Sequence, residues 1–175
     1  MSDPRFPVGK YQRNDHLNDD ERRASIDVLA AAPARLREAI AGLTDAQLDT
    51  PYRDGGWTLR QVVHHLPDSH LNAYMRVKLA LTEDAPTIRP YDEAAWAQLS
   101  DSRDTPVDVS LALFEALHAR WTTLLRALRP DDFARTFKHP EHKGDFTLDD
   151  VVGMYAWHSR HHVAHITTTR ERMGW

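Results

Sequence analysis

Residues 147–172 read TLDDVVGMYAWHSRHHVAHITTTRER, and this stretch decides how the end of the chain folds. Its apolar residues recur at the spacing of an amphipathic helix, with Val151, Tyr155 and Ile166 on one face. Thr147 supplies a side chain suited to a helix N-cap. The pattern therefore predicts one long helix over the whole stretch, with its apolar face turned toward a protein core.

Three earlier segments show the same helical spacing, at residues 19–43, 58–82 and 107–128. Asn18 and Thr58 stand before the first two of these segments as candidate N-caps. No convincing run of alternating apolar and polar residues predicts strands that would compete with the helices. Four long helices predict an all-α fold, in the form of a four-helix bundle.

The connections between the helices differ in character. Residues 84–92 are rich in proline, a short helix is expected over residues 93–99, and residues 138–146 read as irregular. Two connections are long enough to cross the bundle, so a simple up-down-up-down order is not assured. Pro33 and Pro67 lie inside helical patterns, where we expect a kink or a break.

The composition excludes several classes of protein. A length of 175 residues suits a single domain, residues 1–175, and the net charge of −4 gives no electrostatic case for nucleic-acid binding. No apolar run approaches the roughly 18 residues of a membrane span, and no signal peptide is evident, so we expect a cytoplasmic protein. The chain contains no cysteine, which excludes disulfides and thiolate ligands. A metal site would need nitrogen or oxygen ligands.

Four of the eleven histidines lie in the last predicted helix, as two pairs spaced four residues apart. At about 100° per residue, His158 and His162 fall within the apolar face, whereas His161 and His165 fall toward its edge. One inward histidine is more often a hydrogen-bonded core residue than a ligand. Two of them would repel each other if both were protonated, and a shared metal ion removes that difficulty. Periodicity alone supports the two interpretations about equally.

A second cluster, HHLPDSH, contains His64, His65 and His70. On an ideal helix His70 lies near the apolar face, His65 lies beside it, and His64 points away. The pattern thus slightly favours His70 over His65 as a third ligand. Pro67 lies between them and weakens this calculation.

Several segments together resemble the DinB/YfiT-like superfamily, and within it the YfiT group. The resemblance covers essentially the whole chain, with matching lengths between the motifs. Its carrying segments are PVGKYQ (7–12), LDTPYRDGGWTLRQVVHHLPDSHLNAY (48–74), RPYDEAAWAQLSDS (89–102), YAWHSRHHVAHIT (155–167) and RMGW (172–175).

The resemblance implies a four-helix bundle that holds one divalent metal ion, zinc or nickel, through three histidines. These are His65 from an HL motif and the HxxxH pair His158 and His162, so the resemblance overrules the lean toward His70. Pro67 departs from the family, where alanine is common at this place. That departure puts the local geometry of the helix in question.

For function, the resemblance implies a metal-dependent hydrolase that acts on a small molecule through metal-activated water. Related families imply a rival, an S-transferase that uses a low-molecular-weight thiol such as bacillithiol. A non-catalytic metal-binding protein is the third alternative. We also expect a homodimer. Asp68 could orient the His65 imidazole or could equally be a solvated helix residue, and the Tyr155 hydroxyl could contact a metal-bound water, although core packing is the simpler interpretation of Tyr155.

Overall fold

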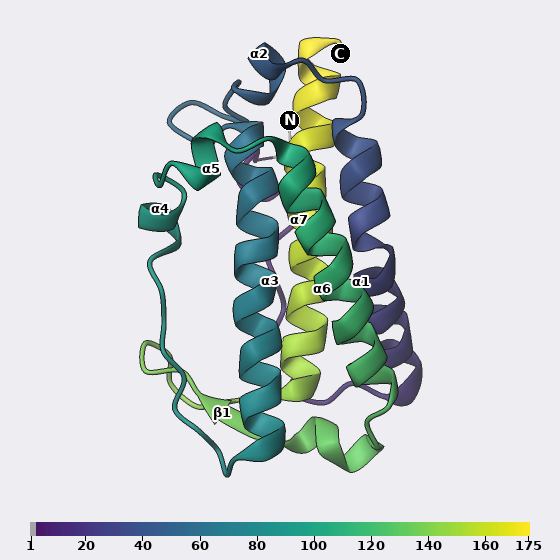
Figure 1. Ribbon diagram of the computed structural model, residues 1–175. Helices are drawn as coiled ribbons and strands as arrows, with labels where there is room; N and C mark the ends of the chain where they lie inside the picture. The colour runs from purple at the N-terminus through teal and green to yellow at the C-terminus, as the bar shows by residue number, and fades with distance from the viewer. Residues whose placement is uncertain (1–2) are drawn as a thin grey trace.

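The computed structural model describes residues 3–175, and four long helices pack side by side along it (Figure 1). These are α1 (Asp19–Ile40), α3 (Leu59–Thr82), α6 (Val107–Arg126) and α7 (Leu148–Met173). The remaining elements are short: α2 (Asp45–Leu48), α4 (Glu93–Trp96), α5 (Asp101–Asp104), the 3₁₀ helix η1 (Pro130–Ala134), and the strands β1 (Thr136–Lys138) and β2 (Asp145–Thr147). The predicted four-helix bundle is confirmed.

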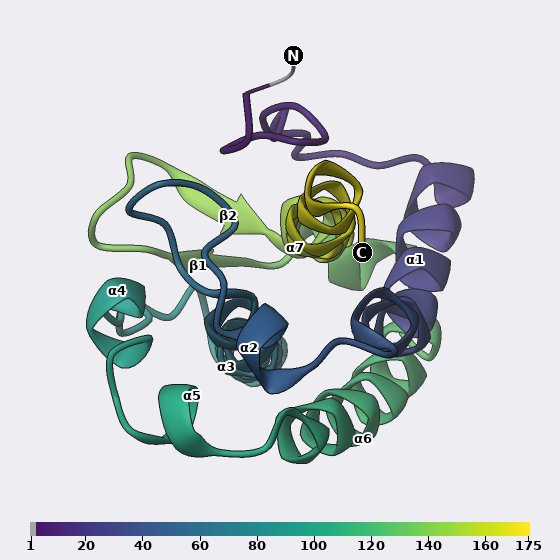
Figure 2. The same ribbon diagram turned by 90° about the horizontal axis from the view of Figure 1, so that it is seen from above.

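The order of the helices around the bundle is not that of a simple meander. α1 packs against α6 and α7, and α3 packs against the same two helices, so α1 and α3 lie diagonally opposite (Figure 2). The colour gradient shows that α1 and α7 run in one direction and that α3 and α6 run in the other (Figure 1). Residues 83–106, which contain α4 and α5, return along the outside of the bundle to the start of α6 (Figures 1 and 2). One long crossover therefore produces two parallel neighbouring pairs, α1 with α7 and α3 with α6.

Side-chain caps fix where the helices begin. Asn18 and Thr58 form capping boxes at the starts of α1 and α3, and Thr44 does the same for α2. The Thr147 side chain accepts a hydrogen bond from the backbone N–H of Asp150 at the start of α7. These bonds satisfy backbone N–H groups that have no partner within a helix, which is why the predicted starting points hold.

The structure corrects several predicted boundaries. α1 ends at Ile40 rather than near residue 43, because Gly42 takes a left-handed φ of 76° and turns the chain. Residues 138–146 are not irregular throughout, since they hold one end of β1, the hairpin turn and part of β2. The Phe137 and Phe146 rings stack at 5.6 Å across this hairpin.

Neither internal proline breaks its helix. Pro33 lies within α1 and Pro67 within α3, and both helices continue past them. A proline lacks the N–H that would bond to the carbonyl four residues earlier, so each costs one helical hydrogen bond. Pro67 is buried between Leu66 and His70, which are fully buried. Packing on both sides of the proline offsets that loss.

The interior consists of two apolar clusters separated by a layer of histidines. Leu66 and Phe114 belong to one cluster, and Ala73 and Trp121 belong to the other. In the sequence, His70 on α3 and His118 on α6 each lie between a residue of the first cluster and a residue of the second. Both histidines are almost completely buried. Within residues 3–175 no helix is long and apolar enough to cross a membrane.

Candidate metal centre

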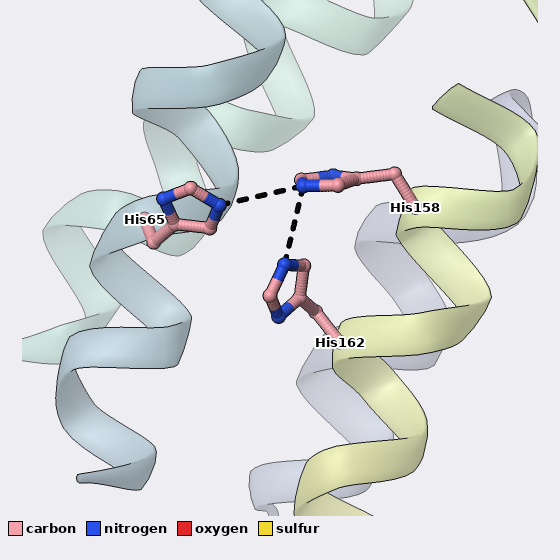
Figure 3. A group of neighbouring side chains, drawn as sticks. All are labelled: His65, His158 and His162. Carbon is pink, nitrogen blue, oxygen red and sulfur yellow. Dashed lines mark hydrogen bonds between the residues drawn. The ribbon is translucent and has the colours of Figure 1, made fainter. Parts of the chain in front are cut away.

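Three histidines converge between α3 and α7 (Figure 3). His158 and His162 lie one turn apart on α7 and point the same way, and His65 on α3 faces them. The Nε2 atom of His158 is 3.3 Å from Nε2 of His65 and 3.1 Å from Nε2 of His162. One potential ligand atom from each residue lies within 4.8 Å of the others.

Burial holds these three imidazoles in their neutral form. Desolvation lowers the pKa of His65 to about 4. Desolvation, and then the neighbouring histidines, lower the pKa of both His158 and His162 well below the ordinary value. Neutral imidazole is the form that coordinates a metal ion, so the electrostatics of the cluster suit ligation.

The spacing of the nitrogens fits a common ion. Bonds of 2.0–2.1 Å to a tetrahedral ion place two nitrogens about 3.3 Å apart, and right-angled octahedral positions place them about 3.0 Å apart. The observed separations of 3.1 and 3.3 Å lie within that span. Mutual hydrogen bonds cannot satisfy all three Nε2 atoms at once, because His158 Nε2 is either one donor or one acceptor. The donor set therefore fits a divalent cation.

His70 points inward, as periodicity predicts, but it lies behind the cluster. Its Nε2 atom is 3.1 Å from Nδ1 of His158, on the side of that ring away from the three facing nitrogens. It thus contacts a candidate ligand and does not join the group of three. Periodicity gives the direction of a side chain but not its depth, which is why the pattern favoured His70 over His65.

His161 and His165 are buried, contrary to their expected place at the edge of the apolar face. The ring of Tyr52 stacks on His165 at 4.1 Å, and Trp157 stacks on His161 at 4.4 Å. Nδ1 of His165 also lies 3.3 Å from Nδ1 of His162. The N-terminal segment and the loop before α3 cover this side of α7, which helical periodicity alone does not reveal.

His64 is buried as well, although an ideal helix directs it away from the apolar face. Its Nδ1 atom lies 2.7 Å from Ser110 Oγ, and its Nε2 atom lies 3.1 Å from the carbonyl of Thr105. The crossover and the start of α6 cover this part of α3. Both ring nitrogens of His64 are thus satisfied away from the cluster.

The two candidate supporting residues have different surroundings. Within residues 3–175, the Asp68 carboxylate forms no hydrogen bond with His65. Burial, and then the charge of Asp101, raise the pKa of Asp68 to about 6. Tyr155 is buried beside His158 with ring centroids 5.4 Å apart, and its hydroxyl is 3.5 Å from Ser69 Oγ. Tyr155 thus lies beside a candidate ligand, and the roles of both residues stay predictions.

The histidines open onto a cavity of about 540 Å³. Its lining includes Arg53, from the loop before α3. Arg5, Tyr91 and Glu93 also line the cavity. These residues come from the N-terminal segment and the crossover, so no spacing within one helix points to them. Glu93 is the only carboxylate among the described residues that line the cavity.

Comparison with known proteins agrees with this architecture. The family model described as the DinB superfamily matches residues 29–166. The chain belongs to the DinB superfamily. A Bacillus subtilis protein named "Putative metal-dependent hydrolase YfiT" is 53% identical over 97% of this chain and 96% of its own length. A Bacillus mycoides protein with a similar name is 50% identical over the full length of both chains.

A solved structure extends the likeness to three dimensions. It is described as "YfiT from Bacillus subtilis is a probable metal-dependent hydrolase with an unusual four-helix bundle topology". It superposes on this DinB superfamily protein with a TM-score of 0.96 and 52% identity, covering 98% of each chain. The family resemblance drawn from the motifs is thereby confirmed, including its YfiT group.

Proposed function

We propose that this protein is a metal-dependent hydrolase of a small molecule, with His65, His158 and His162 holding one zinc or nickel ion. The observation that carries the proposal is the convergence of three Nε2 atoms at the wall of a cavity. A cavity of about 540 Å³ has the size of a small-molecule site. The names of the relatives agree with this activity.

Three protein ligands leave coordination positions free. A divalent ion in such a site supplies Lewis acidity and lowers the pKa of water toward neutrality. The Trp57 ring packs against His65 at 4.8 Å and limits the access of bulk water from that side. Glu93 is the carboxylate of the cavity wall that can accept a proton from water. Arg53, also in the wall, can bind a negatively charged part of a substrate.

The second candidate is a metal-dependent S-transferase that uses a low-molecular-weight thiol. Arg5 and Arg53 line the cavity and would offer cationic partners to a thiol that carries carboxylates. A non-catalytic metal-binding role is the remaining alternative, and the cavity beside the ligands weighs against it. The homodimer and the cytoplasmic location expected from the sequence stay predictions.

Turnover by the metal-loaded protein distinguishes these functions. A panel of small esters and amides would be tested in buffer alone, and a panel of electrophiles would be tested with and without a small thiol. We expect hydrolysis without thiol, and its loss in His158→Ala. Thiol-dependent consumption of the electrophile, with a new metal–sulfur signal in X-ray absorption, would overturn the hydrolase in favour of the transferase. A fourth protein ligand in the same spectrum would contradict both.

A further inference from the structure

A chain of hydrogen bonds crosses all four long helices. His158 Nδ1 on α7 is 3.1 Å from His70 Nε2 on α3. His70 Nδ1 is 2.9 Å from His118 Nε2 on α6, and His118 Nδ1 is 2.6 Å from the backbone carbonyl of Leu29 on α1. The chain begins at a candidate metal ligand and ends at a main-chain oxygen on the far side of the bundle.

The carbonyl at the end of the chain gives it a direction. A backbone carbonyl can only accept a hydrogen bond, so His118 Nδ1 carries a proton and donates it to Leu29. In a neutral His118 the Nε2 atom is then an acceptor, and His70 must donate to it from Nδ1. By the same step His70 Nε2 accepts from Nδ1–H of His158. The Nε2 atom of His158 is left with a free lone pair, and that atom faces His65 and His162.

The surroundings of the chain favour its neutral form. His70 and His118 are 0% and 1% exposed. The rings of Phe114, Trp121 and Tyr155 surround His70, each within 5.8 Å between centroids. No carboxylate takes part in the chain among residues 3–175 to compensate a positive charge, so a charged member would be costly. Burial accordingly lowers the pKa of His118 to about 4.

We propose that His70 and His118 are positioning residues, which hold His158 as the Nδ1–H tautomer with its Nε2 lone pair aimed at the metal position. The inference rests on the proposed metal centre. Metal-binding histidines commonly donate their second N–H to a carboxylate, a carbonyl or water, and loss of that partner typically costs 10–100-fold in affinity. In this protein His158 donates that N–H to His70, and His70 and His118 connect it by hydrogen bonds to the Leu29 carbonyl.

Nitrogen NMR of the metal-free wild-type protein tests the chain directly. Long-range ¹⁵N–¹H correlations distinguish Nδ1–H from Nε2–H in each imidazole. We expect His70, His118 and His158 all to be Nδ1–H tautomers at neutral pH, the form that free histidine in water disfavours. A single Nε2–H form, or a mixture of tautomers, at His158 would overturn the proposal. The measurement needs neither metal nor activity.

Zinc affinity tests the consequence. His118→Phe removes the acceptor for His70, and we expect a mixture of His158 tautomers and a 10–100-fold weaker zinc affinity. His118→Gln restores an amide that can accept from His70, and we expect it to recover most of the affinity. Thr122→Val is the matched control, because Thr122 is buried one turn away and its hydroxyl, within residues 3–175, bonds only to the His118 carbonyl. It should leave tautomers and affinity unchanged.

The outcomes separate this inference from the proposed function. A wild-type protein that binds no zinc would remove the metal centre, and the positioning role with it. Tight zinc binding by the wild type and equally tight binding by folded His118→Phe would overturn the positioning role alone. If His118→Phe fails to fold, the wild-type tautomers and the affinity of His118→Gln still decide the matter. Weak zinc binding by folded His118→Gln while His158 remains the Nδ1–H tautomer would also overturn the positioning role, because the tautomer would then not set the affinity.

Discussion

At the scale of single residues, neighbouring histidines differ in what their nitrogens contact. His64 and His65 are adjacent on α3, but a step of about 100° directs them to different places. His64 bonds to Ser110 and to the Thr105 carbonyl, so both of its nitrogens are satisfied within the protein. His65 Nε2 faces another Nε2, that of His158. The pair therefore offers an internal comparison between a structural histidine and a candidate ligand.

The first prediction uses that comparison. Replacing His65, His158 or His162 by alanine should reduce bound metal from one ion per chain to a small fraction, because two remaining imidazoles hold an ion much less tightly. His64→Ala is the matched control, on the same helix and equally buried, and it should retain the metal. Elemental analysis by mass spectrometry after gel filtration gives the stoichiometry. Equal metal content in all four variants would refute the ligand assignment.

The second prediction concerns Glu93, the carboxylate of the cavity wall. If it accepts a proton from water, Glu93→Gln should lower kcat by about 10²-fold or more while the metal content stays the same. Glu141→Gln, in the exposed hairpin turn, is the control and should leave kcat unchanged. Steady-state kinetics on the best ester or amide gives the comparison. An unaltered kcat in Glu93→Gln would assign the proton transfer to another group.

The residues of the site differ in how far sequence could locate them. Periodicity on α7 selects His158 and His162 over His161, because only the first two share the inward face with Tyr155. The resemblance supplies His65. His118 also lies on a regular apolar face, with Leu111, Phe114 and Trp121, but a lone histidine there reads as a core residue. Its bond to His70 depends on how α3 and α6 pack, which no local pattern encodes.

At the scale of elements, the N-terminal segment is attached to α7 by a partly buried polar contact. The Tyr11 hydroxyl lies 2.6 Å from a carboxylate oxygen of Asp150 and 3.1 Å from its backbone carbonyl. Arg13 lies 3.2 Å from the other carboxylate oxygen of Asp150. Further along, the indole N–H of Trp157 donates to the carbonyl of Gly9. The segment therefore covers the face of α7 that carries His161, and it contributes Arg5 to the cavity wall.

The third prediction tests that attachment. Tyr11→Phe removes the hydroxyl bonded to the buried carboxylate, and it should lower the free energy of unfolding by about 1–3 kcal/mol. The metal content should not change, because the ligands lie elsewhere on α7. Tyr74→Phe is the control, since the Tyr74 hydroxyl makes no hydrogen bond within residues 3–175. Urea denaturation measures both, and equal stabilities would show that the contact contributes nothing.

Local sequence signals predict where the helices start, but they do not predict the short hairpin or the behaviour of a proline inside a helix. The starts of α1, α3 and α7 follow from Asn18, Thr58 and Thr147, whose side chains bond locally. No sequence pattern predicts the β1–β2 hairpin, because its strands have three residues each, too few to show an alternation. The break expected at Pro67 is absent, because tertiary packing of α3 overrides the local preference of proline.

At the scale of the whole molecule, the histidine layer makes the bundle sensitive to acid. Burial lowers the pKa of histidines on α3, α6 and α7 alike, among them His118 and His165, each to about 4. In the unfolded chain the same groups titrate near 6.5. The sequence contains the histidines, and its helical patterns predict the four-helix bundle. It could not predict that so many would be buried, because the crossover and the N-terminal segment complete that burial from a distance.

The fourth prediction follows from this difference between folded and unfolded pKa values. Between pH 6.5 and about 4 the unfolded chain binds more protons than the folded protein, so the free energy of unfolding of the metal-free protein must decrease as pH falls. His118 alone contributes a loss of about 3 kcal/mol by pH 4. Asp68 and Asp150 act in the opposite sense, because burial raises the pKa of both carboxyls, that of Asp68 to about 6, so the folded protein takes up these protons first. These two carboxyls offset only a part of the effect of the several buried histidines.

Urea denaturation at several pH values between 7.5 and 4.5 gives the slope of unfolding free energy against pH. This slope is proportional to the difference between the protons bound by the unfolded chain and by the folded protein. The difference should be near zero above pH 7 and should exceed one proton per chain below pH 6. His118→Gln should reduce this difference by up to one proton below pH 6, since glutamine does not titrate. The control is His16→Gln, which replaces an exposed histidine outside the buried layer. A stability that stays constant from pH 7 to 4.5 would mean that the histidine layer is solvated or already charged. Both the neutral ligand cluster and the hydrogen-bonded chain from Leu29 to His158 would then be untenable, because each requires uncharged imidazoles in the core.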